Sequence, residues 1–319
     1  MLGDMTVRNE AGAPEASADA PARAALDLAG RRAVVRDFLT SRRSRLSPAD
    51  VGLPTRGGER RVPGLRREEV AALAGVSPDY YTRLERGRLE GASDSVLMSL
   101  STALRLSDLE REYLFDLARG PLGGPAPRHA VREVPPAVQH VVDRMDSPAI
   151  VVNTSQQLLH ANAVGRALYA PVLQHGGESF ATFAFLTEQA ADFFEDLERA
   201  CAMIAATMRL DLARSPGDVD LRSLVEELLG ASERFRTAWA RNDVHEHRTG
   251  TKTYRHPVVG RLELDYAVFL LPGTPGLGMT VFSAEPGSAA AERLVELGRR
   301  ARDEMRTTPP GRETTGDAR

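Results

Sequence analysis

Apolar residues upstream of residue 120 recur with the period of an α-helix. The members of this pattern are Val34, Phe38, Leu39, Val96, Leu100, Leu104, Leu109, Tyr113 and Leu114. The helical period persists throughout this half of the chain. It therefore predicts an all-α domain.

The pattern changes after residue 130. Two short apolar runs, 149–152 and 158–160, flank the turn-like segment 153–155 and predict a β-hairpin. Helical spacing returns from about 188 to 239, where a loop at 215–218 divides two or three expected helices.

Strict alternation of apolar and polar residues follows further on. It covers Leu262, Leu264 and Tyr266, and it resumes at Met279 and Val281 after a Pro- and Gly-rich loop. These runs predict two strands. We therefore expect the second half to be α+β, with a small antiparallel sheet closed by helices.

Helix breakers and composition set the domain boundaries. Pro and Gly cluster around 120–127 too densely for regular structure, and both ends of the chain have few large apolar side chains that could drive ordering. The expected organisation is a disordered tail over 1–26, an all-α domain over 27–120, a linker over 121–130, an α+β domain over 131–290, a C-terminal helix over 291–306 and a disordered tail over 307–319.

Charge is segregated along the chain. The net charge is −3, yet residues 28–120 hold 17 Arg against 13 Asp plus Glu, so the rest of the chain is acidic. A polyanionic partner would therefore bind the first half. Lys252 is the only lysine, and the use of arginine in every segment indicates a GC-rich coding bias.

One cysteine, Cys201, can form neither an internal disulfide nor a cysteine-based zinc site. No apolar run approaches the length of a membrane span, and the basic-then-apolar order of a signal peptide is missing. We expect a cytoplasmic protein with no membrane contact and no cofactor.

The segment 67–87 has the pattern of two helices that meet at a sharp turn. Gly75 suits the turn because glycine tolerates a positive φ. Ser77 is a good N-cap and Pro78 a good first helical residue. The shared apolar face is expected to comprise Val70, Leu73, Ala74, Val76, Tyr81 and Leu84.

This arrangement leaves a polar row on the second helix that could enter a major groove. Arg83 could pair with guanine O6 and N7, and the Tyr80 hydroxyl could donate to phosphate. The candidate DNA-binding residues are Arg66, Arg67, Ser77, Pro78, Asp79, Tyr80, Thr82, Arg83 and Arg86. Half-site geometry on a palindromic operator favours a homodimer.

Residues 31–118 resemble the Cro/repressor (XRE) type of helix-turn-helix regulator, a five-helix lambda-repressor-like domain. Arginine-rich segments at 42–48 and 61–70 resemble the subgroup that carries an MmyB-like ligand-binding domain, and further blocks extend the resemblance to about Gly287. The chain departs from this family at Asp196-Leu197, where an Asp-Trp pair is common.

The resemblance implies a PAS-like sheet with helices around a cavity, and a small apolar effector such as a fatty acid. Apolar candidates for the cavity wall are Phe180, Phe183, Phe185, Phe193, Phe194, Met203, Met208, Phe235 and Trp239. Arg241 and His256 are candidate carboxylate anchors. Side chains at helical spacing are also the normal content of a core.

Three alternatives remain. His245, His247 and His256 could bind a metal if the first two share a strand face. An enzyme would need a catalytic constellation, and the sequence offers no phosphate loop or nucleophile elbow. The chain could instead be a regulator controlled by a protein partner, or an interaction module whose helical half docks a partner and for which DNA is incidental, with no small-molecule ligand. A steep salt dependence of binding would favour DNA.

Overall fold

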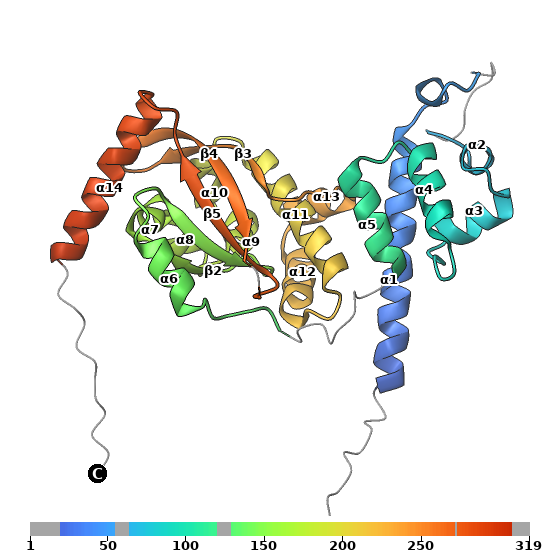
Figure 1. Cartoon of the computed structure of the whole chain (residues 1–319), viewed down its shortest axis with the longest axis horizontal. Helices are drawn as coiled ribbons and strands as arrows, with labels where there is room; N and C mark the ends of the chain where they lie inside the picture. The colour runs from blue at the N-terminus through green and yellow to red at the C-terminus, as the bar shows by residue number, and fades with distance from the viewer. Residues whose placement is uncertain (1–19, 55–63, 120–128, 272, 308–319) are drawn as a thin grey trace, which may run out of the picture. The chain divides into compact units, whose positions relative to one another are not determined.

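The computed structural model describes residues 20–54, 64–119, 129–271 and 273–307. The chain divides into two compact units, residues 1–92 and 93–319, and each is described by itself (Figure 1). The first unit contains α1 (Ala20–Arg45), η1 (Ala49–Val51), α2 (Arg67–Leu73) and α3 (Pro78–Glu85).

The expected turn between α2 and α3 is present. Gly75 has a φ of +68°, and the Ser77 hydroxyl accepts the Tyr80 N–H at 3.1 Å, which caps α3. Helix α3 contacts both α2 and α1. The helices are therefore held together by a core of Phe38, Leu39, Leu65, Val70, Ala71, Tyr81 and Leu84, all at most 1% exposed.

The expected apolar face needs one correction. Leu73 is 37% exposed and Val76 is only half-buried, although both had been assigned to it. The buried stripe is formed by Val70 and Ala71 of α2 and by Ala74, which directly follows the helix. At 100° per residue Leu73 lies to one side of that stripe.

The expected domain boundaries stay predictions. Helix α1 begins at Ala20, inside the segment 1–26 that is expected to be a disordered tail. The rest of that tail lies outside the described residues, and so do most of the expected linker and most of the second tail. The ranges concerned are 1–19, 120–128 and 308–319. The compact units divide at residue 92, because α4 and α5 group with the later elements, and the expected domain boundary at 120 stays a prediction. The five-helix arrangement therefore stays a prediction.

The second unit mixes helices and strands. Its helices are α4 (Asp94–Ala103), α5 (Asp108–Arg119), α6 (Pro136–Asp143), α7 (Ala163–Leu168), α8 (Ala170–His175), α9 (Phe180–Leu186), α10 (Gln189–Phe193), α11 (Leu197–Arg214), α12 (Val219–Ala231), α13 (Glu233–Ala240) and α14 (Ala289–Thr307). Its strands are β1 (Ala149–Asn153), β2 (Leu158–Ala161), β3 (Thr249–His256), β4 (Gly260–Leu270) and β5 (Leu277–Ser283).

The strands form one antiparallel sheet in the order β2-β1-β5-β4-β3. Alternation along β1 separates two apolar layers. Ala149 and Val151 pack with Val142 of α6 on one face of the sheet. Ile150 lies on the other face, in the larger core to which α8, α9 and α11 also contribute. Helix α14 contacts α7 and β4 (Figure 1).

The expected hairpin is β1-β2, and the two alternating runs are β4 and β5. The segment 188–239 contains α10 in addition to α11, α12 and α13, so the expected two or three helices are four. Strand β3 was not expected, because only Tyr254 and His256 in it are buried. No helix within the described part of the chain is long and apolar enough to cross a bilayer.

Candidate functional site

The outer edge of α3 is polar. Asp79 and Arg83 are exposed and Tyr80 is half-buried, whereas Tyr81 and Leu84 are buried in the first unit. The Arg83 guanidinium lies over the Tyr80 ring, 4.8 Å from its centroid. This contact holds the two longest side chains of the polar edge in one group.

A buried ion network attaches α3 to its neighbours. Glu85, 2% exposed, accepts from Arg43 Nε of α1 at 2.6 Å, from Arg67 Nε of α2 and from the Tyr81 hydroxyl at 3.2 Å. Arg43 also donates to the Leu65 carbonyl at 2.7 Å. Burial alone would raise the pKa of Glu85, but the hydrogen bonds from Arg67 and Arg43 lower it. The carboxylate therefore fixes α3 while ionised.

All nine candidate DNA-binding residues reach the surface of the first unit. Arg66, Arg67, Ser77, Pro78, Asp79, Arg83 and Arg86 are exposed, and Tyr80 and Thr82 are half-buried. Arg67 is partly committed to Glu85, so it serves the fold as well as any DNA contact. The base and phosphate contacts themselves stay predictions.

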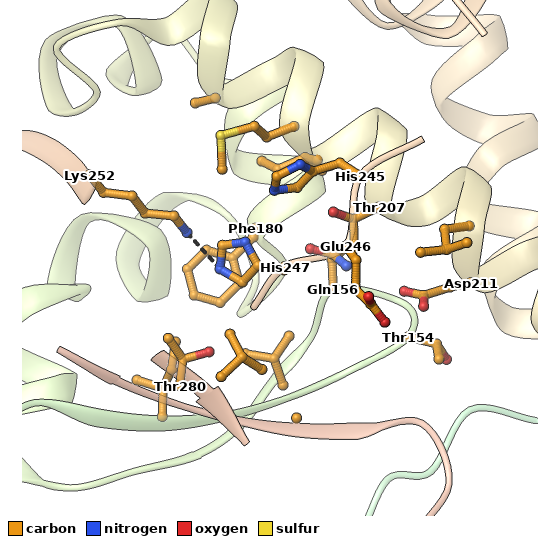
Figure 2. A pocket seen from close by; sticks show the side chains of 18 of the residues that line it. Thr154, Gln156, Phe180, Thr207, Asp211, His245, Glu246, His247, Lys252 and Thr280 are labelled. Atoms are coloured by element: carbon orange, nitrogen blue, oxygen red, sulfur yellow. Dashed lines mark hydrogen bonds between the residues drawn. The ribbon is translucent and has the colours of Figure 1, made fainter. Parts of the chain in front are cut away.

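The second unit contains a cavity of about 630 Å³. Its wall is formed by the inner side of the sheet, by α11 and by the segment 245–247 (Figure 2). Much of the wall is apolar, with Ile150 and Val152 on β1, Phe180 on α9 and Ile204 on α11. This size and lining are typical of a small-molecule site.

Three of the candidate wall residues line this cavity, namely Phe180, Phe194 and Met203. The other candidates lie outside the wall of this cavity, namely Phe183, Phe185, Phe193, Met208, Phe235, Trp239, Arg241 and His256, and a ligand-binding role for them stays a prediction. Most pack on one another instead. The Phe183 and Phe193 ring centroids are 5.9 Å apart, and the Phe235 ring stacks on Trp239.

The two candidate anchors point elsewhere for separate reasons. Arg241 is exposed at the end of α13. His256 is 3% exposed and both of its ring nitrogens have partners: Nε2 donates to the Ala167 carbonyl at 3.0 Å, and Nδ1 accepts the Val258 N–H at 3.2 Å. Neither is available to a ligand in the cavity.

The polar groups that do line the cavity include Lys252 of β3. Its Nζ lies 3.1 Å from His247 Nε2 (Figure 2). The same Nζ lies 4.8 Å from the centroid of the Tyr266 ring, on which His247 stacks at 4.3 Å. Burial lowers the pKa of Lys252 to about 7 and, together with Lys252 and His245, lowers the pKa of His247 to about 2. His247 is therefore neutral, and Lys252 titrates near neutral pH.

Two further basic groups belong to the same wall, His245 and Arg199. The Nε2 atom of His245 is buried without a hydrogen-bond partner, and burial lowers the pKa of this imidazole. A buried polar atom without a partner costs free energy unless a ligand or water satisfies it.

Acidic groups in the wall are already engaged or favour the neutral form. Glu246 pairs with Arg214 at 2.9 Å, and Glu195 with Arg261 at 2.9 Å. Asp196 caps α11 through the Arg199 N–H. Burial raises the pKa of Asp211 to about 7, and this residue lies on the side of the cavity away from Lys252 (Figure 2).

The metal alternative gains no support from the geometry. Residues 245–247 precede β3 and are not in a strand, and no group of three or more metal-binding side chains gathers among the residues that the structure describes. Cys201 is buried and its Sγ lies 3.6 Å from the Ala184 carbonyl, and burial raises the pKa of its thiol to about 12. This thiol packs in the core.

Comparison with known families gives two matches. Residues 35–114 match a helix-turn-helix domain, and residues 134–297 match the MmyB-like transcription regulator ligand binding domain. Comparison with curated proteins gives no match. Both matched domains are regulatory, and together they indicate a ligand-modulated transcription regulator. Since the second match spans half of the 319 residues, the chain belongs to the MmyB-like transcription regulator family.

Proposed function

We propose that this regulator binds a roughly palindromic operator as a homodimer through α3, and that a small, largely apolar, fatty-acid-like effector in the cavity alters its operator affinity. The observation that carries the proposal is the cavity of about 630 Å³ inside the segment that matches the ligand-binding domain. Its apolar wall suits an aliphatic chain. The five-stranded antiparallel sheet with helices around the cavity also supports a PAS-like domain.

The outward edge of α3 supports the DNA-binding part. The exposed Arg83 lies over the ring of the half-buried Tyr80, and the Glu85 network fixes the helix that carries them. A side chain on a rigid helix is held in the orientation that base contacts require. Dimerisation follows from the two-fold symmetry of such operators.

A contact inside the second unit gives the effector a route to the helical segment. Arg214 lines the cavity and pairs with Glu246. The same guanidinium lies 3.8 Å from Asp116 and 3.9 Å from Glu112 of α5, and Glu112 falls within the helix-turn-helix match. An effector that displaces Arg214 would change the environment of α5.

The effector part is tested by operator binding. The full chain, stripped of bound lipid, should bind DNA from beside its own gene with a Kd that changes at least about fivefold when dodecanoate is added, a typical coupling. Fluorescence anisotropy measures this change. Thr207→Trp, which fills the cavity, should abolish the response, whereas Thr237→Trp, on an exposed position of α13, should keep it. An unchanged Kd in the unaltered protein would remove the effector from the proposal.

The DNA-binding part is tested on α3. Arg83→Ala should weaken operator binding about 10- to 100-fold, because a bidentate guanine contact is lost. Tyr80→Ala should weaken specific and nonspecific DNA more equally, as expected for a phosphate contact. Arg255→Ala is the control, since Arg255 is exposed on β3. Equal Kd values for Arg83→Ala and Arg255→Ala would reject α3 as the recognition helix.

A further inference from the structure

The cavity has a basic end. Lys252, His247 and His245 lie there with Arg199, and burial, followed by electrostatic repulsion from Lys252, lowers the pKa of both imidazoles. Apart from these groups, the Tyr266 ring faces Lys252. Of the wall carboxylates, Glu195, Asp196 and Glu246 have other partners, and Asp211 lies on the side of the cavity away from Lys252 (Figure 2). The hydrogen-bonding partner of the Lys252 Nζ in the described part of the chain is His247.

We propose that this basic end binds the anionic head group of a carboxylate ligand, and that Lys252 takes up a proton when the ligand binds. The inference deepens the proposed function, on which it rests, by assigning the polar end of the effector. The apolar part of the ligand lies along Ile150, Val152 and Ile204. The ligand is therefore an organic acid with an aliphatic body.

Hydrogen-bonding capacity supports the assignment. An ammonium group has three donors, and Lys252 directs one at His247 Nε2, 3.1 Å away. Two donors remain for a carboxylate. His245 Nε2, buried without a partner, becomes a further donor in the tautomer that carries its proton there.

The lysine itself has a function that arginine could not supply. Lys252 is the only lysine among 41 Lys and Arg residues. Lys252 is half-buried, and a desolvated lysine can lose its proton, whereas a guanidinium keeps its charge. Without a ligand the cavity wall therefore avoids an unpaired, poorly solvated charge, and a bound carboxylate restores the ammonium as half of an ion pair.

Isothermal titration calorimetry on the lipid-stripped full chain tests the head-group assignment, with decanoate and decan-1-ol as probes. Decanoate should bind more tightly than the alcohol. Lys252→Met should weaken decanoate binding about 10- to 100-fold, the scale of a charge-assisted hydrogen bond, and leave the alcohol unchanged. Equal loss for both probes, or none for decanoate, overturns the assignment.

Proton uptake is measured by repeating the titration in buffers of different ionisation enthalpy. With a Lys252 pKa of about 7 in the empty cavity, uptake should approach one proton per decanoate at pH 8 and fall toward zero near pH 6. Lys252→Arg should still bind decanoate but take up no proton, since arginine is already charged. Uptake that persists in Lys252→Arg would assign the proton to another group, such as Asp211, and overturn the proposal.

These outcomes are separable from those of the operator experiment. Decanoate that binds at Lys252 without altering operator affinity would refute the proposed regulation and keep the head-group site. An operator response that survives in Lys252→Met, with unchanged decanoate affinity, would refute the site and keep the regulation.

Discussion

Glu85→Ala is expected to lower the free energy of unfolding of the first unit by about 3 to 5 kcal/mol, which is the cost of removing one partner of a buried ion pair. The carboxylate has three hydrogen-bonding partners from three helices, Arg43, Arg67 and Tyr81. Its removal leaves the Arg43 guanidinium buried, with the Leu65 carbonyl still accepting from it. Hydrogen exchange of the α1, α2 and α3 amides measures the loss, because it reports local opening in the full chain.

The matched control is Glu90→Ala. Glu90 pairs with Arg32 at 3.3 Å, but the two side chains are 56% and 40% exposed, so the loss should stay below about 1 kcal/mol. If both variants exchange at the same rate, the Glu85 network contributes nothing beyond a surface pair. In that case α3 would depend on its apolar face alone.

The same network predicts how the first unit responds to acid. The folded pKa of Glu85 lies below its ordinary value of 4.5. Its stabilising contribution is therefore complete above about pH 4.5 and is lost as the pH falls through the folded pKa. Amide exchange in α3 should accelerate below pH 4.5 once corrected for the intrinsic rate, and this extra acceleration should be missing in Glu85→Ala.

The turn between α2 and α3 was predictable because its determinants are local. Gly75, Ser77 and Pro78 act within a few residues of one another, through a positive φ, a side-chain cap and a fixed φ. The polar outer edge of α3, with Asp79 and Arg83 exposed and Tyr80 half-buried, then follows from helical periodicity. The Glu85 network was not predicted, because Arg43 and Glu85 are far apart in the sequence and meet only when the helices pack.

The cavity wall was largely unpredictable for a related reason. Apolar residues at helical spacing show which face of a helix is buried, but not whether that face meets another side chain or an empty volume. Phe183 and Phe180 belong to the same helix, yet only Phe180 lines the cavity. The distinction depends on how the other elements pack.

The basic end of the cavity carried a weak signal in the sequence. His245 and His247 stood out as a pair, and Lys252 stood out as the only lysine. Their meeting depends on β3, which brings Lys252 opposite Leu264 of β4. Since β3 lacks a regular apolar alternation, periodicity alone did not reveal the strand, and the polar pair at Lys252 and His247 could not be placed.

Gly87→Ala is expected to destabilise the first unit by about 3 kcal/mol or more, from backbone strain and overpacking together. Gly87 follows α3 with a φ of +88°, and an added Cβ would lie 2.2 Å from the Arg32 carbonyl oxygen of α1. The contacted atom belongs to the backbone of Arg32 and not to the flexible end of a side chain. The backbones of α1 and of the segment after α3 would therefore have to separate. Amide exchange in both helices should rise and operator affinity should fall with it.

Gly75→Ala provides the comparison that isolates the close approach. Gly75 has a similar φ of +68°, but an added Cβ would meet no atom within 4 Å. Only the strain of the left-handed conformation remains, about 1 kcal/mol. The difference between the two variants therefore measures the contact between the backbones of α1 and the segment after α3. If the two alanine variants lose equal stability, that contact does not hold α3 in place, and the orientation of its exposed edge must depend on Glu85 and the apolar core.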